Sequence, residues 1–353
     1  MRILIYSSEN MEKTPRELGY QMPAEWEAHD ATWVSWPKNP ETFPKSIIGK
    51  VEEAYCQIVN AISEGETVKI LVDDEKSKMH ASKLLEKSGC RMENIQFKLI
   101  KTADVWARDY GPTFILNRKT KQRAAVKWQF NAWGNKYTDL LFDNGTGEKI
   151  IEDCKIDYFE PDFVMEGGSI DVNGNGELLT TKQCLLNKNR NPDLSQKEIE
   201  AYLKSFLGVD RIIWLNKGIE GDDTDGHIDD IARFVSKNKI AIASSNKNDA
   251  DGRALLENCK ILKSETDFEI IKLPMPAKII DKEENRQLPA SYANFYITNK
   301  TVLLPVFDDK ADKDVIALLE SLFSGREVIP IPSKDLVYGY GSVHCITQQE
   351  PKI

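Results

Sequence analysis

The apolar and polar positions of this chain form short apolar runs that alternate with amphipathic segments of helical spacing. Short apolar runs bounded by turn residues are typical of buried strands. They predict strands at Val68–Val72, Thr113–Leu116, Ala125–Trp128, Leu178–Thr181 and Ile240–Ala243. The helical spacing predicts helices at Lys76–Lys87, Ser195–Phe206 and Asp314–Phe323. The alternation of the two kinds of element indicates an α/β fold.

Two of these helices carry end signals. Ser195 followed by Glu198 is a capping box, in which each side chain bonds the backbone at the other position. Gly325 follows the third helix as a stop signal. The segment Asp171–Gly176 begins like a calcium loop, but its twelfth position is Lys182 rather than a carboxylate. We therefore predict a hairpin turn there and no metal site.

Polar or reactive residues recur beside glycines, aromatic residues or apolar runs. After His29, they are spaced by roughly 60 residues, close to one small β/α unit per interval. These residues are Asp109, Glu166, His227, Asn294 and Cys345. The surrounding segments are not alike in sequence, so the spacing alone suggests repeated units that each bring a polar group to one central site. With no linker-like stretch in between, we expect one domain over residues 1–353.

Composition limits the classes of protein that this chain can belong to. It has 353 residues, of which 41% are hydrophobic and 29% charged, as in ordinary globular proteins. No apolar run approaches the ~20 residues of a membrane span, and no signal peptide is evident, so we expect a cytoplasmic protein. The net charge is −9 and the Lys and Arg residues are scattered, which disfavours nucleic-acid binding. An acidic chain suits a cationic substrate.

The cysteines offer a candidate nucleophile. The chain has six, and none forms a C-x-x-C pair, so neither a zinc ribbon nor a thioredoxin-like site is expected. Cys345 follows His344 in a segment rich in glycine, which suits a reactive side chain at a loop end. A thiol needs a base or a cation nearby to become a nucleophilic thiolate. The alternative for Cys345 is a buried structural cysteine.

Three further segments could supply the groups around such a thiol. His227 and Asp229 would point to the same side of a strand, although an acidic surface loop is equally consistent with the run from Asp222 to Asp230. Asp109 lies between an indole and a tight turn, and Glu166 precedes two glycines; either acid could be an ordinary turn residue. The aromatic stretch Trp128–Tyr137 suits a stacking wall for a planar cation, or a packed hairpin.

Seven motifs together, in the same order along the chain, resemble the agmatine deiminase family. That family is part of the larger pentein group, which includes arginine deiminases and bacterial-type peptidylarginine deiminases. The motifs are Met22-Pro-Ala-Glu-Trp-Glu-Ala-His29, Trp106-Ala-Arg-Asp-Tyr-Gly-Pro112, Phe130-Asn-Ala-Trp-Gly134, Glu166-Gly-Gly-Ser169, Gly226-His-Ile-Asp229, Leu288-Pro-Ala-Ser-Tyr-Ala-Asn-Phe-Tyr296 and His344-Cys-Ile-Thr-Gln-Gln349.

The resemblance implies a fold and a set of roles. The fold is the pentein α/β-propeller, five ββαβ-like units about a pseudo-fivefold axis, with Gly226–Asp229 strand-like. Cys345 would be the nucleophile, His227 the general acid/base, Asp109 and Asp229 the guanidinium clamps, and Glu166 the partner of His227. The resemblance also implies a homodimer, a part in putrescine biosynthesis and no cofactor.

Charge around these motifs favours agmatine, a dication, as the substrate. The stretch Trp128–Tyr137 contains no Arg, and three Asp residues precede His227. Arg108 and Arg233 remain candidate ligands for a substrate carboxylate. The alternatives are therefore a deiminase of free or C-terminal peptidyl arginine, or an inactive pentein that binds a cationic metabolite. We expect four residues to contact the substrate: Trp106, Trp133, Asn294 and Asp223, the last by pairing with the ammonium group of agmatine.

Overall fold

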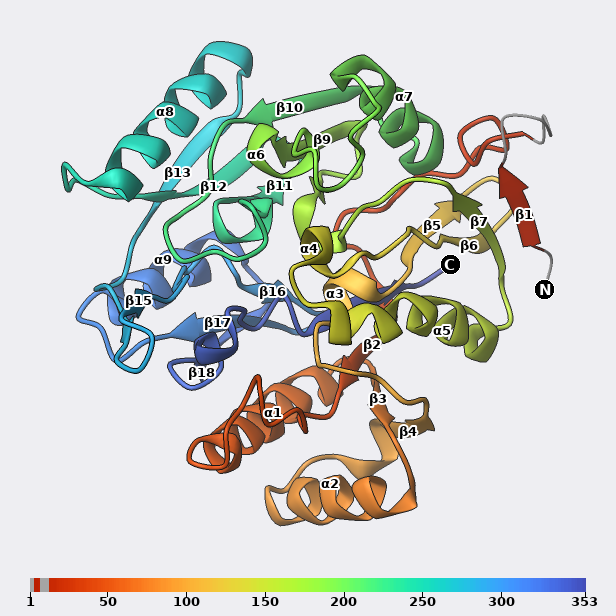
Figure 1. The fold of residues 1–353 in the computed structure, drawn as a ribbon. Helices are drawn as coiled ribbons and strands as arrows, with labels where there is room; N and C mark the ends of the chain where they lie inside the picture. The colour runs from red at the N-terminus through yellow and green to blue at the C-terminus, as the bar shows by residue number, and fades with distance from the viewer. Residues whose placement is uncertain (1–2, 7–12) are drawn as a thin grey trace.

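The computed structural model describes residues 3–6 and 13–353 as a mixed α/β structure in which the longer helices lie toward the outside (Figure 1). One sheet joins the C-terminal strand to three strands from the first hundred residues: β19 (Thr347–Pro351), β2 (His29–Ser35), β3 (Thr67–Val72) and β4 (Ile95–Leu99). Its crossover helices are α1 (Ile48–Ser63) and α2 (Glu75–Lys87). The short α3 (Ala107–Tyr110) and α4 (Ala132–Asn135) lie near the centre of the view.

The remaining sheets follow one another along the chain. The next contains β1 (Ile3–Tyr6), β5 (Thr113–Asn117), β6 (Gln122–Val126) and β7 (Asp157–Pro161), with helix α5 (Thr146–Cys154). It is followed by β8 (Asp171–Val172), β9 (Glu177–Thr181) and β10 (Arg211–Leu215), with α6 (Lys182–Leu185) and α7 (Gln196–Leu207). The fourth sheet contains β11 (Ala232–Ser236), β12 (Lys239–Ser244) and β13 (Glu269–Pro274), with helix α8 (Ala250–Glu265). The fifth contains β16 (Tyr296–Ile297), β17 (Thr301–Val306) and β18 (Glu327–Pro332), with helix α9 (Asp312–Leu322). A hairpin of β14 (Ile280–Asp281) and β15 (Arg286–Gln287) stands apart from these sheets.

Within the described residues, five of the six sheets share one topology. Each contains an antiparallel pair whose second strand pairs in parallel with the next strand along the chain. A parallel partner requires a crossover, and a helix provides it in every case: α1, α5, α7, α8 or α9. In the first sheet the antiparallel partner of β2 is β19, so the C-terminal strand completes the sheet that β2 begins.

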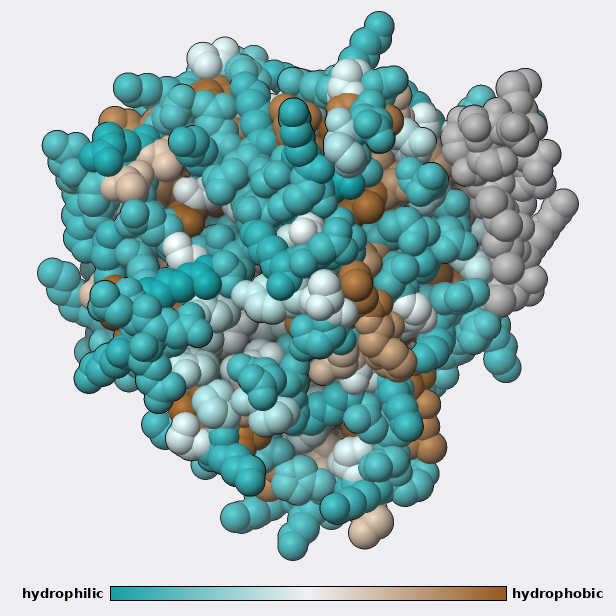
Figure 2. Space-filling view, in the orientation of Figure 1, coloured by the Kyte–Doolittle hydropathy of each residue, from teal (hydrophilic) through white to brown (hydrophobic). Residues whose placement is uncertain are grey.

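Each crossover helix buries one apolar face against its sheet. In α1 the buried face includes Val51, Tyr55, Ile58 and Ile62, which belong to the same apolar cluster as the strand residue Ile70. Full burial of one such side chain contributes about 1.5–3 kcal/mol. The outer surface is mainly hydrophilic in the view of Figure 2, with apolar side chains in small separate groups. No helix among the described residues is long and apolar enough to cross a membrane.

Most predicted elements are confirmed. The capping box of Ser195 and Glu198 begins α7, and the segment after Asp171 turns between the antiparallel strands β8 and β9. Two predictions are wrong in detail. The strand predicted at Ala125–Trp128 ends at Val126, because the chain then leaves the sheet to carry Trp128 into the apolar core. The Gly226–Asp229 segment is not strand-like, because a 3₁₀ turn over Ile228–Asp230 follows His227 directly.

Candidate active site

The five recurring polar residues lie in equivalent places in the five similar sheets. Asp109, Glu166, His227, Asn294 and Cys345 each precede the first strand of an antiparallel pair by two to five positions. Those strands are β5, β8, β11, β16 and β19. All five side chains are buried. The regular spacing seen in the sequence therefore has a structural basis, although the residues lie in the segments before the strands, Asp109 in the short helix α3, rather than in the strands.

A cavity of about 160 Å³ reaches two of these residues, Asp109 and Cys345. Its aromatic walls include Trp106, Trp133 and Tyr340. Of the described residues that line it, seven are acidic and none is Lys or Arg. The acidic residues are Glu41, Asp104, Asp109, Asp139, Asp223, Asp281 and Glu284. The cavity is therefore suited to a cation with a planar or apolar part.

Trp133 reaches the cavity through an unusual backbone turn. Ala132, Trp133, Gly134 and Asn135 all have positive φ, between 52° and 85°. Left-handed backbone costs non-glycine residues roughly 1–2 kcal/mol each, and such strain is often found at functional sites. The turn lets the indole Nε1 of Trp133 donate to Asp109 Oδ2 at 2.9 Å. The other oxygen of Asp109 accepts the backbone N–H of Gly168 at 3.0 Å.

Close packing between two loops explains Gly168. A Cβ added there would lie 2.6 Å from His227 Nδ1 and 2.8 Å from Asp109 Oδ1. Any other residue would therefore separate His227 from Asp109. The pKa of Asp109 is raised to about 6, chiefly by burial. The charge of His227 and the hydrogen bond from the indole of Trp133 lower this pKa, whereas the charges of Asp229 and Glu166 raise it.

Cys345 belongs to the edge of an apolar cluster, but its sulfur contacts hydrogen-bonding groups. Asn294 Nδ2 donates to its Sγ at 3.2 Å, and the thiol lies 3.6 Å from Asp229 Oδ2. Burial raises the pKa of the Cys345 thiol well above its usual range, and the charges of Asp229, Asp230 and Asp109 raise it further. Without a bound cation, Cys345 is thus held mainly as the thiol.

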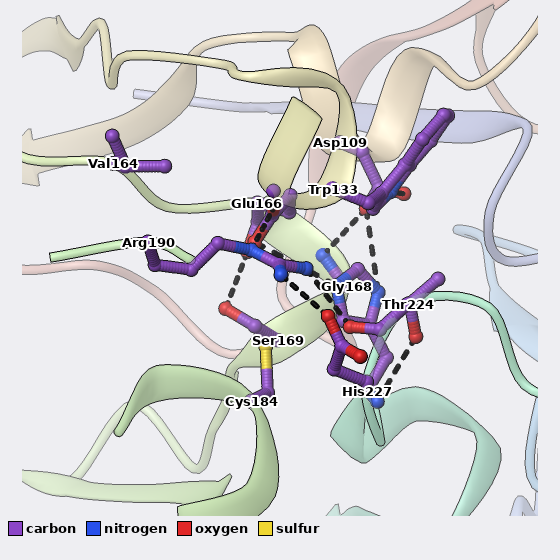
Figure 3. Close-up of polar contacts among 12 residues, drawn as sticks. Asp109, Trp133, Val164, Glu166, Gly168, Ser169, Cys184, Arg190, Thr224 and His227 are labelled. Carbon is purple, nitrogen blue, oxygen red and sulfur yellow. Dashed lines mark hydrogen bonds and ion pairs between the residues drawn. The ribbon is translucent and has the colours of Figure 1, made fainter. Parts of the chain in front are cut away.

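The ring of His227 lies between two carboxylates (Figure 3). Its Nδ1 is 3.7 Å from Asp109 Oδ1, and its Nε2 is 3.8 Å from Glu166 Oε2. Burial would lower the pKa of His227, but these charges, led by Asp109, raise it well above its usual range. Neither ring nitrogen has a hydrogen-bond partner in the described part of the chain, and Asp229 Oδ1 also has none. Unsatisfied buried polar atoms are rare, and these three belong to residues that adjoin the cavity residues Asp109 and Cys345.

Arg190 holds Glu166 from the other side. Its Nε donates to Glu166 Oε1 at 2.7 Å, and its Nη1 bonds Asp225 at 2.6 Å. Burial would raise the pKa of Glu166, but the charge of Arg190 outweighs it and the pKa is lowered. Glu166, Cys184 and His227 have the ligand types and spacing of a metal site. The guanidinium on Glu166 already supplies the positive charge there, so we assign no metal to this group.

A second buried layer fixes Asp229. His344 Nδ1 bonds Asp229 Oδ2 at 2.7 Å, and His344 Nε2 bonds Glu25 Oε2 at 2.8 Å. Arg233 pairs with the other oxygen of Glu25 at 2.9 Å. Burial would raise the pKa of both carboxyls, but both are lowered, chiefly by His344 at Asp229 and by Arg233 and His344 at Glu25. Both ring nitrogens of His344 are thus occupied by carboxylate oxygens, and these contacts fix the position of Asp229 beside the thiol.

The structure brings most of the predicted site residues together. Trp106, Asp109, Trp133, Asp223 and Cys345 line the cavity, and His227, Glu166 and Asp229 lie directly behind it. Asn294 contacts the sulfur of Cys345 instead of lining the cavity. The aromatic stretch divides: Trp133 and Tyr137 line the cavity, whereas Trp128 packs against Phe163 in the core.

Other residues of the site have roles that the sequence left open or did not reveal. Arg108 and Arg233 are buried and bond Glu25, so they hold the scaffold and do not line the cavity. Glu25, Arg190 and His344 were not assigned to the site. Glu25 and His344 do fall in two of the family-like motifs, which was the one available clue, but only the folded chain shows that they meet.

Comparison with known proteins extends these similarities over the whole chain. Residues 21–351 match the family model of the Porphyromonas-type peptidyl-arginine deiminases. A Legionella pneumophila protein that bears the agmatine deiminase name provisionally is 41% identical, over 97% of this chain and 98% of that protein. Agmatine deiminase of Ectopseudomonas mendocina (strain ymp) is 36% identical, over 96% and 97%. The solved structure of Enterococcus faecalis agmatine deiminase superposes with a TM-score of 0.88 at 30% identity, covering 97% of this chain and 99% of that chain.

Proposed function

We propose that this chain, which belongs to the Porphyromonas-type peptidyl-arginine deiminase family, is an agmatine deiminase. It hydrolyses the guanidinium group of agmatine to N-carbamoylputrescine and ammonia. The observation that carries this proposal is a cavity with a cysteine and a carboxylate at its inner end and, among its described lining residues, seven acids and no base. The curated relative and the solved structure reported above bear the same activity in their names.

The guanidinium is held by carboxylates. Asp109 reaches the cavity directly, and Asp229 has one buried oxygen, Oδ1, with no partner among the described residues. Carboxylates bind the planar N–H groups of a guanidinium by charge-assisted hydrogen bonds. The indoles of Trp106 and Trp133 supply flat walls for the same cation. The central carbon is thereby presented to Cys345.

Binding of this cation helps to form the nucleophile. Two unit charges about 4 Å apart attract by roughly 4 kcal/mol at an effective dielectric constant near 20. Even a third of that energy lowers the thiol pKa by about one unit. Asn294 adds a hydrogen bond to the sulfur that strengthens when the thiol ionises. The substrate and Asn294 together offset the raised thiol pKa that burial and the Asp side chains cause.

The reaction then proceeds in two stages. The Cys345 thiolate attacks the central carbon, and a tetrahedral adduct forms. His227, whose raised pKa keeps it protonated, gives its proton to one nitrogen, which leaves as ammonia. The C–N bond breaks and an S-alkylthiouronium remains on Cys345. His227, now neutral, takes a proton from water, and the resulting hydroxide adds to the same carbon. The C–S bond then breaks with its electron pair going to sulfur, the sulfur takes the hydroxyl proton, and the ureido product leaves with the Cys345 thiol regenerated.

Ammonia release by the purified protein tests the substrate. We expect kcat/KM for agmatine to exceed that for free arginine, because none of the described residues that line the cavity is a Lys or Arg that could bind a carboxylate. Comparable turnover of C-terminal peptidyl arginine would contradict the assignment. No turnover of any guanidino compound would favour the inactive, cation-binding alternative.

The repeated topology supports a finer proposal about architecture. The five similar sheets form a pseudo-fivefold propeller around Asp109, Glu166, His227, Asn294 and Cys345, and residues 1–353 act as one domain. We further propose a cytoplasmic homodimer that works in putrescine biosynthesis. Light scattering after gel filtration tests the dimer, and cell fractionation tests the location.

A further inference from the structure

The mouth of the cavity carries a bound ion pair. Arg286 on β15 donates to both oxygens of Asp223, from Nη1 to Oδ2 at 3.0 Å and from Nη2 to Oδ1. Its guanidinium also lies 4.4 Å from the ring centroid of Tyr340. Asp223 and Tyr340 line the cavity, whereas Arg286 does not. Arg286 is therefore a cation held just behind the rim, one contact away from the ligand space.

Asp223 has little capacity left for a further donor. Besides the two-pronged contact with Arg286, its Oδ2 accepts the hydroxyl of Tyr137. A bidentate arginine–carboxylate pair is among the stronger protein hydrogen-bond arrangements. A substrate ammonium would have to compete with it. This arrangement differs from the simple pairing of Asp223 with the ammonium group of agmatine that the sequence suggested.

The other cations near this loop are also occupied. Lys136 Nζ contacts Asp225 Oδ1 at 2.7 Å and the backbone oxygen of Asp223 at 2.6 Å, and Arg190 bonds Asp225 as well. Tyr340, which shields one face of Arg286, donates its hydroxyl to Glu284 at 2.9 Å. The mouth thus presents acidic groups to the ligand, while its nearest arginine is neutralised.

We propose that Asp223 sets the preference for a dication by masking Arg286, not by binding the substrate's ammonium group. The proposal rests on the agmatine deiminase function above. With its fork bound to Asp223, Arg286 cannot take a carboxylate, although a free guanidinium at that place would suit one. Exposing Arg286 would attract the carboxylate of arginine and repel the ammonium of agmatine.

Four variants separate masking from direct binding. In Asp223→Asn, which exposes the charge of Arg286, kcat/KM should fall for agmatine and rise for arginine. Because partly exposed charge pairs contribute about 0–1 kcal/mol each, the ratio of kcat/KM for agmatine to kcat/KM for arginine should fall by roughly tenfold. The double variant Asp223→Asn/Arg286→Gln removes both charges, so its ratio should return near that of the unmodified protein. Arg286→Gln alone should lower arginine turnover further.

Asp139→Asn is the matched control, because Asp139 is an exposed acid that lines the same cavity and is not paired with Arg286. It changes the net charge as Asp223→Asn does but exposes no arginine. Masking requires a much larger change of the substrate ratio in Asp223→Asn than in Asp139→Asn. Equal changes would show a general charge effect and overturn the proposal.

The double variant decides the question even if a single variant fails to fold. If the double variant loses the preference for agmatine that the unmodified protein shows, Asp223 binds the ammonium directly and masking is wrong. An unchanged ratio in every variant would also overturn masking. Failure of the proposed function is a distinct result, namely that the unmodified protein releases no ammonia from agmatine.

Discussion

Replacing Asn294 with Ala should suppress the reactivity of Cys345 without substrate present. The amide Nδ2 of Asn294 lies 3.2 Å from the sulfur, and its orientation is fixed because its Oδ1 accepts the backbone N–H of His344 at 2.9 Å. A hydrogen bond to a charged group contributes about 1.5–3 kcal/mol. One pKa unit corresponds to ~1.4 kcal/mol, so loss of this bond should raise the thiol pKa by roughly one to two units.

The assay is alkylation of Cys345 by iodoacetamide at several pH values, followed by mass spectrometry. Below the thiol pKa the rate follows the thiolate fraction, so it should fall about tenfold to a hundredfold in Asn294→Ala. Ser291→Ala is the control. Ser291 lies in the same loop as Asn294, but its hydroxyl donates to the backbone oxygen of Asp230 and not to the sulfur. An alkylation rate equal to that of the control, or faster, would refute the assigned role of Asn294.

Four further predictions concern the groups around the thiol. His227→Ala should reduce kcat by 10²–10⁴-fold, measured by ammonia release, and a loss under fivefold would contradict its acid/base role. The pKa of Asp109 is raised to about 6, above that of an unfolded Asp. Its ionisation therefore opposes folding, and stability is lost as the pH rises through about 6. Asp109→Asn should raise Tm at pH 7 but abolish turnover, and a lower Tm would argue against this. In the unmodified enzyme KM for agmatine should increase as pH falls below about 6, since the clamp is then neutral. His344→Gln should raise KM by a larger factor than it lowers the thiol alkylation rate, because His344 holds Asp229 and not the sulfur. A fall in the alkylation rate as large as the rise in KM would place His344 in another role.

Local patterns predicted the secondary structure well where local forces decide it. The capping box at Ser195 and Glu198 is satisfied within three residues, so it could be identified from the sequence. The left-handed turn at Trp133 could not, because it conflicts with the residue's own backbone preference and depends on contacts such as that with Asp109. The 3₁₀ turn after His227 was missed for a different reason: the spacing of the apolar residues that follow His227 fits more than one kind of element.

The site itself was predictable only in part. Motifs marked Cys345, His227, Asp109, Asp229 and Glu166, and the even spacing suggested that they converge. The supporting contacts join distant residues: His344 meets Glu25 across 319 positions, and Arg286 meets Asp223 across 63. No local pattern encodes such pairs. Asp223 shows the consequence, because a carboxylate that looked free in the sequence is held by an arginine in the folded chain.

Covalent trapping tests the central claim most directly. The protein is mixed with agmatine, quenched with acid within one turnover, digested and mapped by mass spectrometry. A mass addition equal to agmatine less ammonia on the peptide that contains Cys345 is the predicted result. It should be absent in Cys345→Ser, which should also release no ammonia, whereas Cys184→Ser should retain both. An adduct on another cysteine, or full ammonia release by Cys345→Ser, would contradict the account.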